Sequence, residues 1–118
     1  MCMNKSEALK KIQNSIADGA QLITPKGQMY EEFVDKCSKI LIEHVIDPVE
    51  ATVVSTCCPE GDFEKYRKSK VWAIAHMNDS WLLTIEGENE FALGFGSDKD
   101  NILMHGFSSS DALGEWCT

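Results

Sequence analysis

The side chains best suited to bind a metal lie in the strand-rich part of the chain, at Cys57, Cys58, His76, His105 and Cys117. Structural zinc sites place their ligands in pairs separated by about two to four residues, and neighbouring cysteines cannot both reach one ion comfortably. None of these ligand-type residues has that spacing. We therefore predict no metal and no other cofactor.

A cysteine nucleophile is the second chemistry to weigh, with Cys57 or Cys58 activated by His76 or His105 as the base. A thiol becomes reactive only when a base or a positive group lies within hydrogen-bonding reach. The competing interpretation is that these thiols end a strand and pack as small apolar groups, since free cysteine is among the most buried residue types. We favour the second interpretation and assign no catalytic residue.

Aromatic residues mark a candidate small-molecule pocket at Trp72, His76 and Trp81. Residues 71–77 and 80–85 both resemble strands, and strict alternation places His76 on the same face as Trp72 and Ile74. Tryptophans that face each other can line a pocket or anchor an interface. They also build ordinary cores, so both interpretations stay open.

Two clusters of charge are candidate contact surfaces. Glu86, Glu88 and Glu90 crowd one end of a predicted hairpin and form a candidate acidic surface. Residues 65–70 hold four cations around a tyrosine, a composition that can contact a phosphate or an acidic partner. The acidic residues within 60–64 precede this stretch, and they favour a solvated segment in which the charges offset each other.

The overall charge restricts the class of partner. The chain has 118 residues, a formal net charge of −8 and a sequence pI near 4.7. Phosphate backbones and anionic lipid surfaces should repel it, so we predict neither nucleic acid nor membrane as a partner and expect steering toward basic protein surfaces. The length predicts a single domain over residues 1–118. The five cysteines are irregularly spaced and no long apolar run occurs, which predicts free thiols and a cytoplasmic protein.

Apolar periodicity predicts two N-terminal helices. The first runs from Asn4, as N-cap to Glu7, to about residue 20, with Gly19 as its stop. The second opens at Thr24-Pro25 and ends at Asp47-Pro48, because the residue before a proline avoids helical backbone angles.

The rest of the chain predicts strands and a closing helix. Strands are expected at 51–57, 71–77, 80–85, 90–95 and 102–107, while 62–70 stays open between a loop and a short helix. The strand at 71–77 is apolar on both sides, which is typical of a strand covered on both faces. Residues 108–111 match a capping box before a short C-terminal helix. The predicted fold class is α+β: two N-terminal helices, a four- or five-stranded mainly antiparallel meander sheet, and a short C-terminal helix.

In size, charge and helix-then-meander order, the chain resembles the small acidic α+β proteins carried on bacterial mobile gene cassettes and beside toxin genes, among which immunity and inhibitor proteins are frequent. The resemblance implies a non-catalytic binding protein that acts by protein–protein contact through its acidic hairpin and exposed aromatic residues. The alternative hypothesis is a small-molecule-binding or enzymatic domain with a pocket between the sheet and the helices. A third is a homodimer formed through an apolar helix or a strand edge.

Overall fold

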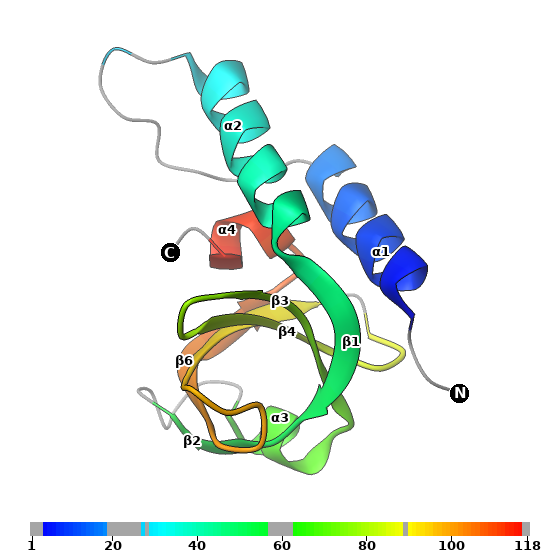
Figure 1. The fold of residues 1–118 in the computed structure, drawn as a ribbon, viewed down its shortest axis with the longest axis vertical. Coiled ribbons are helices and arrows are strands. Elements are labelled where there is room, and N and C mark those ends of the chain that lie inside the picture. Colours follow the sequence, from blue (N-terminus) through cyan, green and yellow to red (C-terminus); the bar gives the residue numbers. More distant parts are fainter. Residues whose placement is uncertain (1–3, 19–26, 28, 57–62, 89, 117–118) are drawn as a thin grey trace.

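The computed structural model describes residues 4–18, 27, 29–56, 63–88 and 90–116. Helices and strands follow one another along the chain as predicted for an α+β domain (Figure 1). The helices are α1 (Lys5–Ala17), α2 (Tyr30–Glu43), α3 (Phe63–Lys68) and α4 (Ala112–Trp116). The strands are β1 (Val45–Ala51), β2 (Val53–Thr56), β3 (Val71–Met77), β4 (Ser80–Ile85), β5 (Phe91–Phe95) and β6 (Ile102–Ser109).

Helix α1 begins as the sequence predicts. The side chain of Asn4 accepts a hydrogen bond from the Glu7 backbone N–H at 2.8 Å, which satisfies one of the free donors of the first turn. Ala8 and Ile12, one turn apart, are fully buried and hold the helix against the protein. The helix ends at Ala17, and the predicted stop at Gly19 lies outside the described residues.

Helix α2 is shorter than predicted at its C-terminal end. It ends at Glu43, and the prediction that it continues to Asp47-Pro48 is wrong, because strand β1 begins at Val45. Two features explain the error. The segment is rich in β-branched residues, which suit a strand. In the described sheet β1 pairs with β3 alone, so Pro48 lies on an edge strand, where its missing N–H is tolerated.

The start of α2 also differs from the prediction. The helix begins at Tyr30, after Met29 in extended conformation, and the Met29 side chain makes no capping hydrogen bond. The predicted start at Thr24-Pro25 lies outside the described residues.

The six strands form one sheet in the order β1-β3-β4-β5-β6-β2, with one strand more than predicted because of β1. Every pairing is antiparallel except the parallel pair of β2 with β6. The two edge strands are consecutive in the chain and are joined by Thr52, whose N–H donates to the Lys99 carbonyl and whose carbonyl accepts from the Ile102 N–H. This link curls the sheet into a barrel-like shape (Figure 1).

The curled sheet separates two hydrophobic clusters, and β3 contributes to both, which confirms that it is covered on both faces. The helix-side core contains the residues that pack between the sheet and the helices: Ala8, Ile12, Leu41, Val45, Trp72, Ile74, Ala75, Leu82, Phe91, Ala112, Leu113 and Trp116. The barrel core contains the residues inside the curl: Val53, Tyr66, Val71, Ala73, Trp81, Leu83, Ile85, Ala92, Ile102 and Met104.

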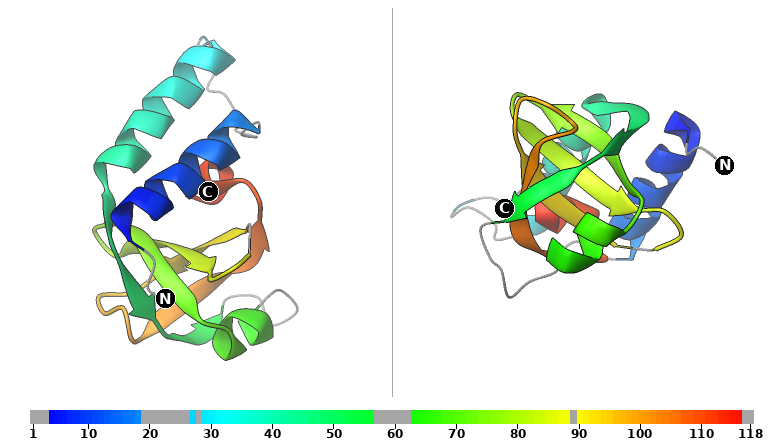
Figure 2. Two further views of the ribbon diagram at one scale, coloured as in Figure 1. Left: turned by 90° about the vertical axis from the view of Figure 1, so that its right-hand side faces the viewer. Right: turned by 90° about the horizontal axis from the view of Figure 1, so that it is seen from below.

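Two short helices complete these cores. Residues 62–70, which the sequence left open, contain α3, and its Tyr66 is buried in the barrel core while Phe63 packs against it. Helix α4 is capped by Asp111, whose side chain accepts from the Gly114 N–H at 2.9 Å. Figure 2 shows α3 at the opposite end of the barrel from α1, α2 and α4.

The described elements form one compact body. Its radius of gyration is 13.6 Å, close to the value of about 13 Å expected for a globular domain of this length. Among the described helices, none is both long enough and apolar enough to cross a membrane.

Candidate functional site

The structure divides the three residues of the candidate aromatic pocket between the two faces of the sheet. Trp72 belongs to the helix-side core, and Trp81 belongs to the barrel core. Both are almost completely buried, as is Trp116. The tryptophans therefore act as core residues in this fold, which is the second of the two interpretations that the sequence left open.

His76 lies beside Trp81 and not on the face of Trp72. A bulge in β3 between Ala73 and Ala75 adds one residue to the strand, so the simple alternation used in the sequence prediction fails at this point. His76 consequently pairs with Trp81, and the two rings stack with centroids 3.8 Å apart and planes 12° apart. The predicted common face of Trp72, Ile74 and His76 is wrong for the histidine.

The polar atoms of these aromatic side chains have different surroundings. The Trp81 indole N–H donates to the Gly96 carbonyl at 2.8 Å. Trp72 Nε1 and His76 Nε2 are buried and have no hydrogen-bond partner among the described residues. The Lys70 ammonium lies 5.2 Å from the centre of the Trp72 ring, a cation–π arrangement at the edge of the sheet.

The candidate acidic surface lies against the protein's own lysines. Glu90 pairs with Lys65 at 2.8 Å, and Glu86 lies 3.8 Å from Lys70, while Glu88 is exposed. Burial lowers the pKa of Lys11 from 10.5, although the nearby Glu88 and Glu90 act in the opposite direction. Much of the negative charge at this hairpin is therefore offset within the molecule.

The basic stretch 65–70 is offset in the same way. Glu64 accepts from Arg67 at 2.7 Å and lies 3.7 Å from Lys68. The hydrogen bond from Arg67 lowers the pKa of Glu64 and, in return, raises the pKa of Arg67. The predicted neutralisation by preceding acidic residues is confirmed for Glu64, whereas the other acidic residues of 60–62 lie outside the described residues.

The described residues include few of the groups named for the candidate thiol and metal chemistry. Cys57, Cys58 and Cys117 lie outside them. His105 is exposed and meets the Phe95 ring edge-on, with centroids 6.0 Å apart. Over the residues that the structure covers, no three His, Cys, Asp or Glu side chains are grouped to hold a metal ion.

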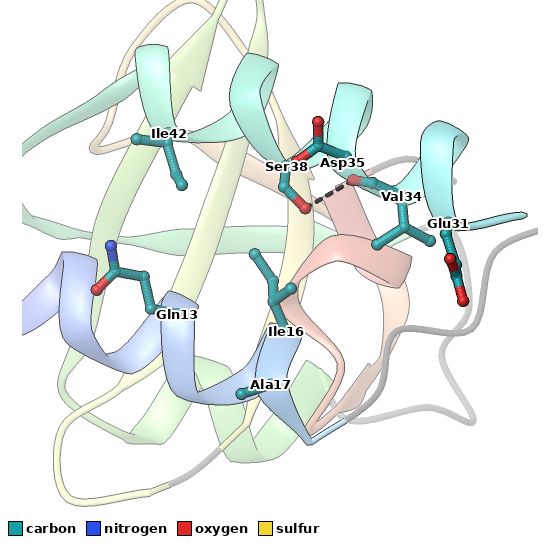
Figure 3. A pocket seen from close by; sticks show the side chains of 8 residues that line it. All are labelled: Gln13, Ile16, Ala17, Glu31, Val34, Asp35, Ser38 and Ile42. Carbon is teal, nitrogen blue, oxygen red and sulfur yellow. Dashed lines mark hydrogen bonds between the residues drawn. The ribbon is translucent and has the colours of Figure 1, made fainter.

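The structure contains a groove that the sequence did not predict. Helices α1 and α2 run antiparallel, and a cavity of about 430 Å³ opens between them (Figure 3). Its lining, as far as the described residues show it, comes from these two helices: Gln13, Ile16, Ala17, Glu31, Val34, Asp35, Ser38 and Ile42. We call this cavity the α1–α2 groove.

Apolar side chains form the floor of the α1–α2 groove and carboxylates stand at its rim. Ile16 and Val34 are half-buried and pack at the edge of the helix-side core, while Ile42 is 37% exposed. Glu31 and Asp35 are exposed and stand one turn apart on α2. The groove thus combines an apolar floor with negative charge, which suits an apolar segment that also carries positive charge.

The hydroxyl of Ser38 is the third polar group on the α2 side of the groove. It donates to the Val34 carbonyl at 2.7 Å, one turn back along the same helix. This bond is local to α2, so the hydroxyl satisfies its donor without any group from α1 (Figure 3).

A signal for the groove exists in the sequence. Ile40, Leu41 and Ile42 are consecutive, and residues of a helix turn about 100° per position, so the three cannot all face one core. In the structure Leu41 is fully buried, while Ile40 and Ile42 are each 37% exposed on its two sides. The sequence prediction used the apolar pattern to assign the helix and did not separate its buried positions from its exposed ones.

Comparison with protein-family models, with curated proteins and with solved structures gave no match. The function must therefore be argued from the geometry of this chain alone.

Proposed function

We propose that the protein is a non-catalytic binding domain of the inhibitor or immunity-like class, and that it receives an apolar segment of another protein in the α1–α2 groove. The observation that carries this proposal is the open apolar floor between the two helices, with Ile42 left 37% exposed on it. Apolar surface that is exposed and rimmed by polar groups is characteristic of protein interaction sites.

The dimensions of the groove support a protein segment as the occupant. Its lining on α2 extends from Glu31 to Ile42, which corresponds to about 16 Å along a helix axis, or three turns. A helix of that length packs against two others at axis distances of about 8–10 Å. Binding of an apolar helix face in a groove is a common mode of peptide recognition.

The charge of the chain supports the same class. A net charge of −8 accelerates the encounter with a basic protein, as in complexes where an acidic inhibitor covers a basic target. Glu86 and Glu90 are already paired with the protein's own lysines. This pairing makes the groove a better candidate contact surface than the acidic hairpin.

A tagged pull-down from host lysate at low and high salt tests this proposal with two matched variants. Ile42→Gln removes an exposed apolar side chain from the groove, and Val54→Gln removes one from β2, where Val54 is 47% exposed. We expect one stoichiometric partner with the wild type and with Val54→Gln, and its loss with Ile42→Gln. Equal capture by all three proteins would place the interface elsewhere.

A second candidate function, binding of a small molecule, is favoured by the size of the cavity. A volume of about 430 Å³ lies in the range of about 300–1,000 Å³ that is usual for ligand pockets. The ligand would sit between the two helices and not at Trp72, His76 and Trp81. A metabolite screen that raises the Tm of the wild type but not of Val34→Trp, which fills the groove, would support this function.

A further inference from the structure

We infer that the occupant of the α1–α2 groove is a basic amphipathic helix of about three turns. Its apolar face covers the floor of the groove, and its lysine or arginine side chains lie beside Glu31 and Asp35. The inference rests on the proposed function, because it names the chemistry of the partner at that same site.

The charge of the groove lining carries this inference. Among the described residues that line the groove, Glu31 and Asp35 are the charged ones, and both are acidic. They stand four positions apart on α2, so their Cβ atoms are about 6 Å apart on one face. Two cations one turn apart on a neighbouring helix match this spacing.

The existing partner of Asp35 can be exchanged. Asp35 pairs with Lys39 at 3.0 Å, and the two side chains are 67% and 72% exposed. An ion pair in such contact with water contributes little free energy. When a partner covers the apolar floor, its cation interacts with Asp35 away from bulk water, where the attraction is stronger. It can therefore replace Lys39, and little free energy is lost.

The walls of the groove favour a helix over an extended segment. The described lining residues come from α1 and α2, whose backbone groups are bonded within each helix except at its ends. An extended peptide needs a sheet edge to pair its backbone N–H and C=O groups, and the described lining holds no strand. A helix satisfies its own backbone and presents only side chains to the groove.

The same charges oppose a second copy of this chain as the occupant. A symmetric pair would bring the acidic rims of two grooves together, and each copy carries a net charge of −8. Juxtaposed like charges weaken an interface. A basic partner reverses the sign of that interaction.

Three synthetic peptides of about 14 residues, the length of α2 itself, test the inference. They share one stripe of leucines at helical spacing and differ only in the flanking residues, which are lysine, glutamine or glutamate. Titration calorimetry on the full chain measures each affinity at low and high salt. We expect the lysine peptide to bind about tenfold more tightly than the glutamine peptide, the glutamate peptide to bind most weakly, and the difference to shrink in high salt.

A charge reversal with a matched control locates the effect. The double variant Glu31→Lys with Asp35→Lys should prefer the glutamate peptide. The control is Glu86→Lys with Glu88→Lys, which changes the net charge by the same amount at two exposed carboxylates of the β4–β5 hairpin. It should keep the preference for lysine, and circular dichroism would confirm that both variants fold.

The outcomes separate this inference from the proposed function. Equal affinity for the three peptides, lost in Ile42→Gln, would overturn the basic partner but leave the groove as a binding site. No binding of any peptide, together with partner capture that Ile42→Gln does not change, would overturn both. A dimer detected by sedimentation and lost in Ile42→Gln would make a second copy the occupant and overturn the inference.

Discussion

Helices α1 and α2 have nearly the same length, 13 and 14 residues, yet the protein uses them differently. In α1, Ala8, Ile12 and Ser15 are buried at successive turns, so the helix is held against the body along most of its length. Among the α2 side chains that the structure describes, only Leu41 is fully buried, and it lies near the C-terminal end.

The anchoring of α2 explains this difference. At its C-terminal end the helix continues without a loop into β1, and the His44 carbonyl between them accepts from the His76 N–H at 3.0 Å. The His44 ring is bonded through Nδ1 to the Ile40 carbonyl at 2.8 Å. The rest of α2 extends away from the barrel (Figure 2), which leaves one face free to build the groove.

The largest expected effect comes from the same substitution made in each helix. Ile12→Ala removes a fully buried side chain from the helix-side core and should lower the free energy of unfolding by about 2–5 kcal/mol. Ile42→Ala removes a side chain that is already 37% exposed and should cost less than about 1 kcal/mol. Urea denaturation measures both, and equal losses would show that α2 is packed as tightly as α1.

The second comparison uses one serine in each helix. The Ser15 hydroxyl donates to the Ser110 carbonyl at 2.6 Å and accepts from the Ala112 N–H at 2.8 Å, which ties α1 to the start of α4. Ser15→Ala leaves the buried Ala112 N–H and the Ser110 carbonyl without this partner and should cost about 1–3 kcal/mol.

The matched control for Ser15 is Ser38→Ala. The Ser38 hydroxyl bonds only one turn back along α2, and alanine is the better helix former. We therefore expect no loss of stability. A destabilisation as large as that of Ser15→Ala would contradict the contrast between the helices.

The smallest effect is a pH dependence from Lys11, which α1 holds against the sheet. Burial lowers the pKa of Lys11 below 10.5, so the folded protein binds this proton less tightly than the unfolded chain. The contribution of Lys11 to stability is therefore present above pH 10.5 and is lost as the pH falls through the lowered pKa. The stability of the wild type relative to Lys11→Met should rise toward alkaline pH, and a difference that falls would contradict this placement.

The sequence predicts the features that short-range patterns control. Asn4 and Glu7 mark the start of α1, and the alternating residues of β4 and β5 mark the antiparallel meander, because capping and cross-strand packing involve neighbours in the chain. The sequence does not predict features that depend on pairing between strands far apart in the chain. The start of β1 at Val45 depends on pairing with β3, and the placement of His76 depends on the bulge after Ala73.

The groove was hidden for a different reason. Val34 and Ile42 both lie within the predicted second helix, but periodicity reports only that a face is apolar and not which element covers it. Whether α1 closes over that face depends on the angle at which α2 leaves the barrel. That angle is set by the direct connection to β1, which the sequence prediction placed inside the helix.

The central claim is that the groove, and not the acidic hairpin, receives a basic helix. The most direct test is a nuclear magnetic resonance titration of the isotope-labelled chain with the lysine-flanked peptide. If the peptide binds in the groove, the changes in backbone chemical shift should concentrate on the groove lining, at Ile16, Val34 and Ile42. The Ile42→Gln variant should show no such changes. Shifts that concentrate on residues 86–90 instead, with the groove unchanged, would contradict it.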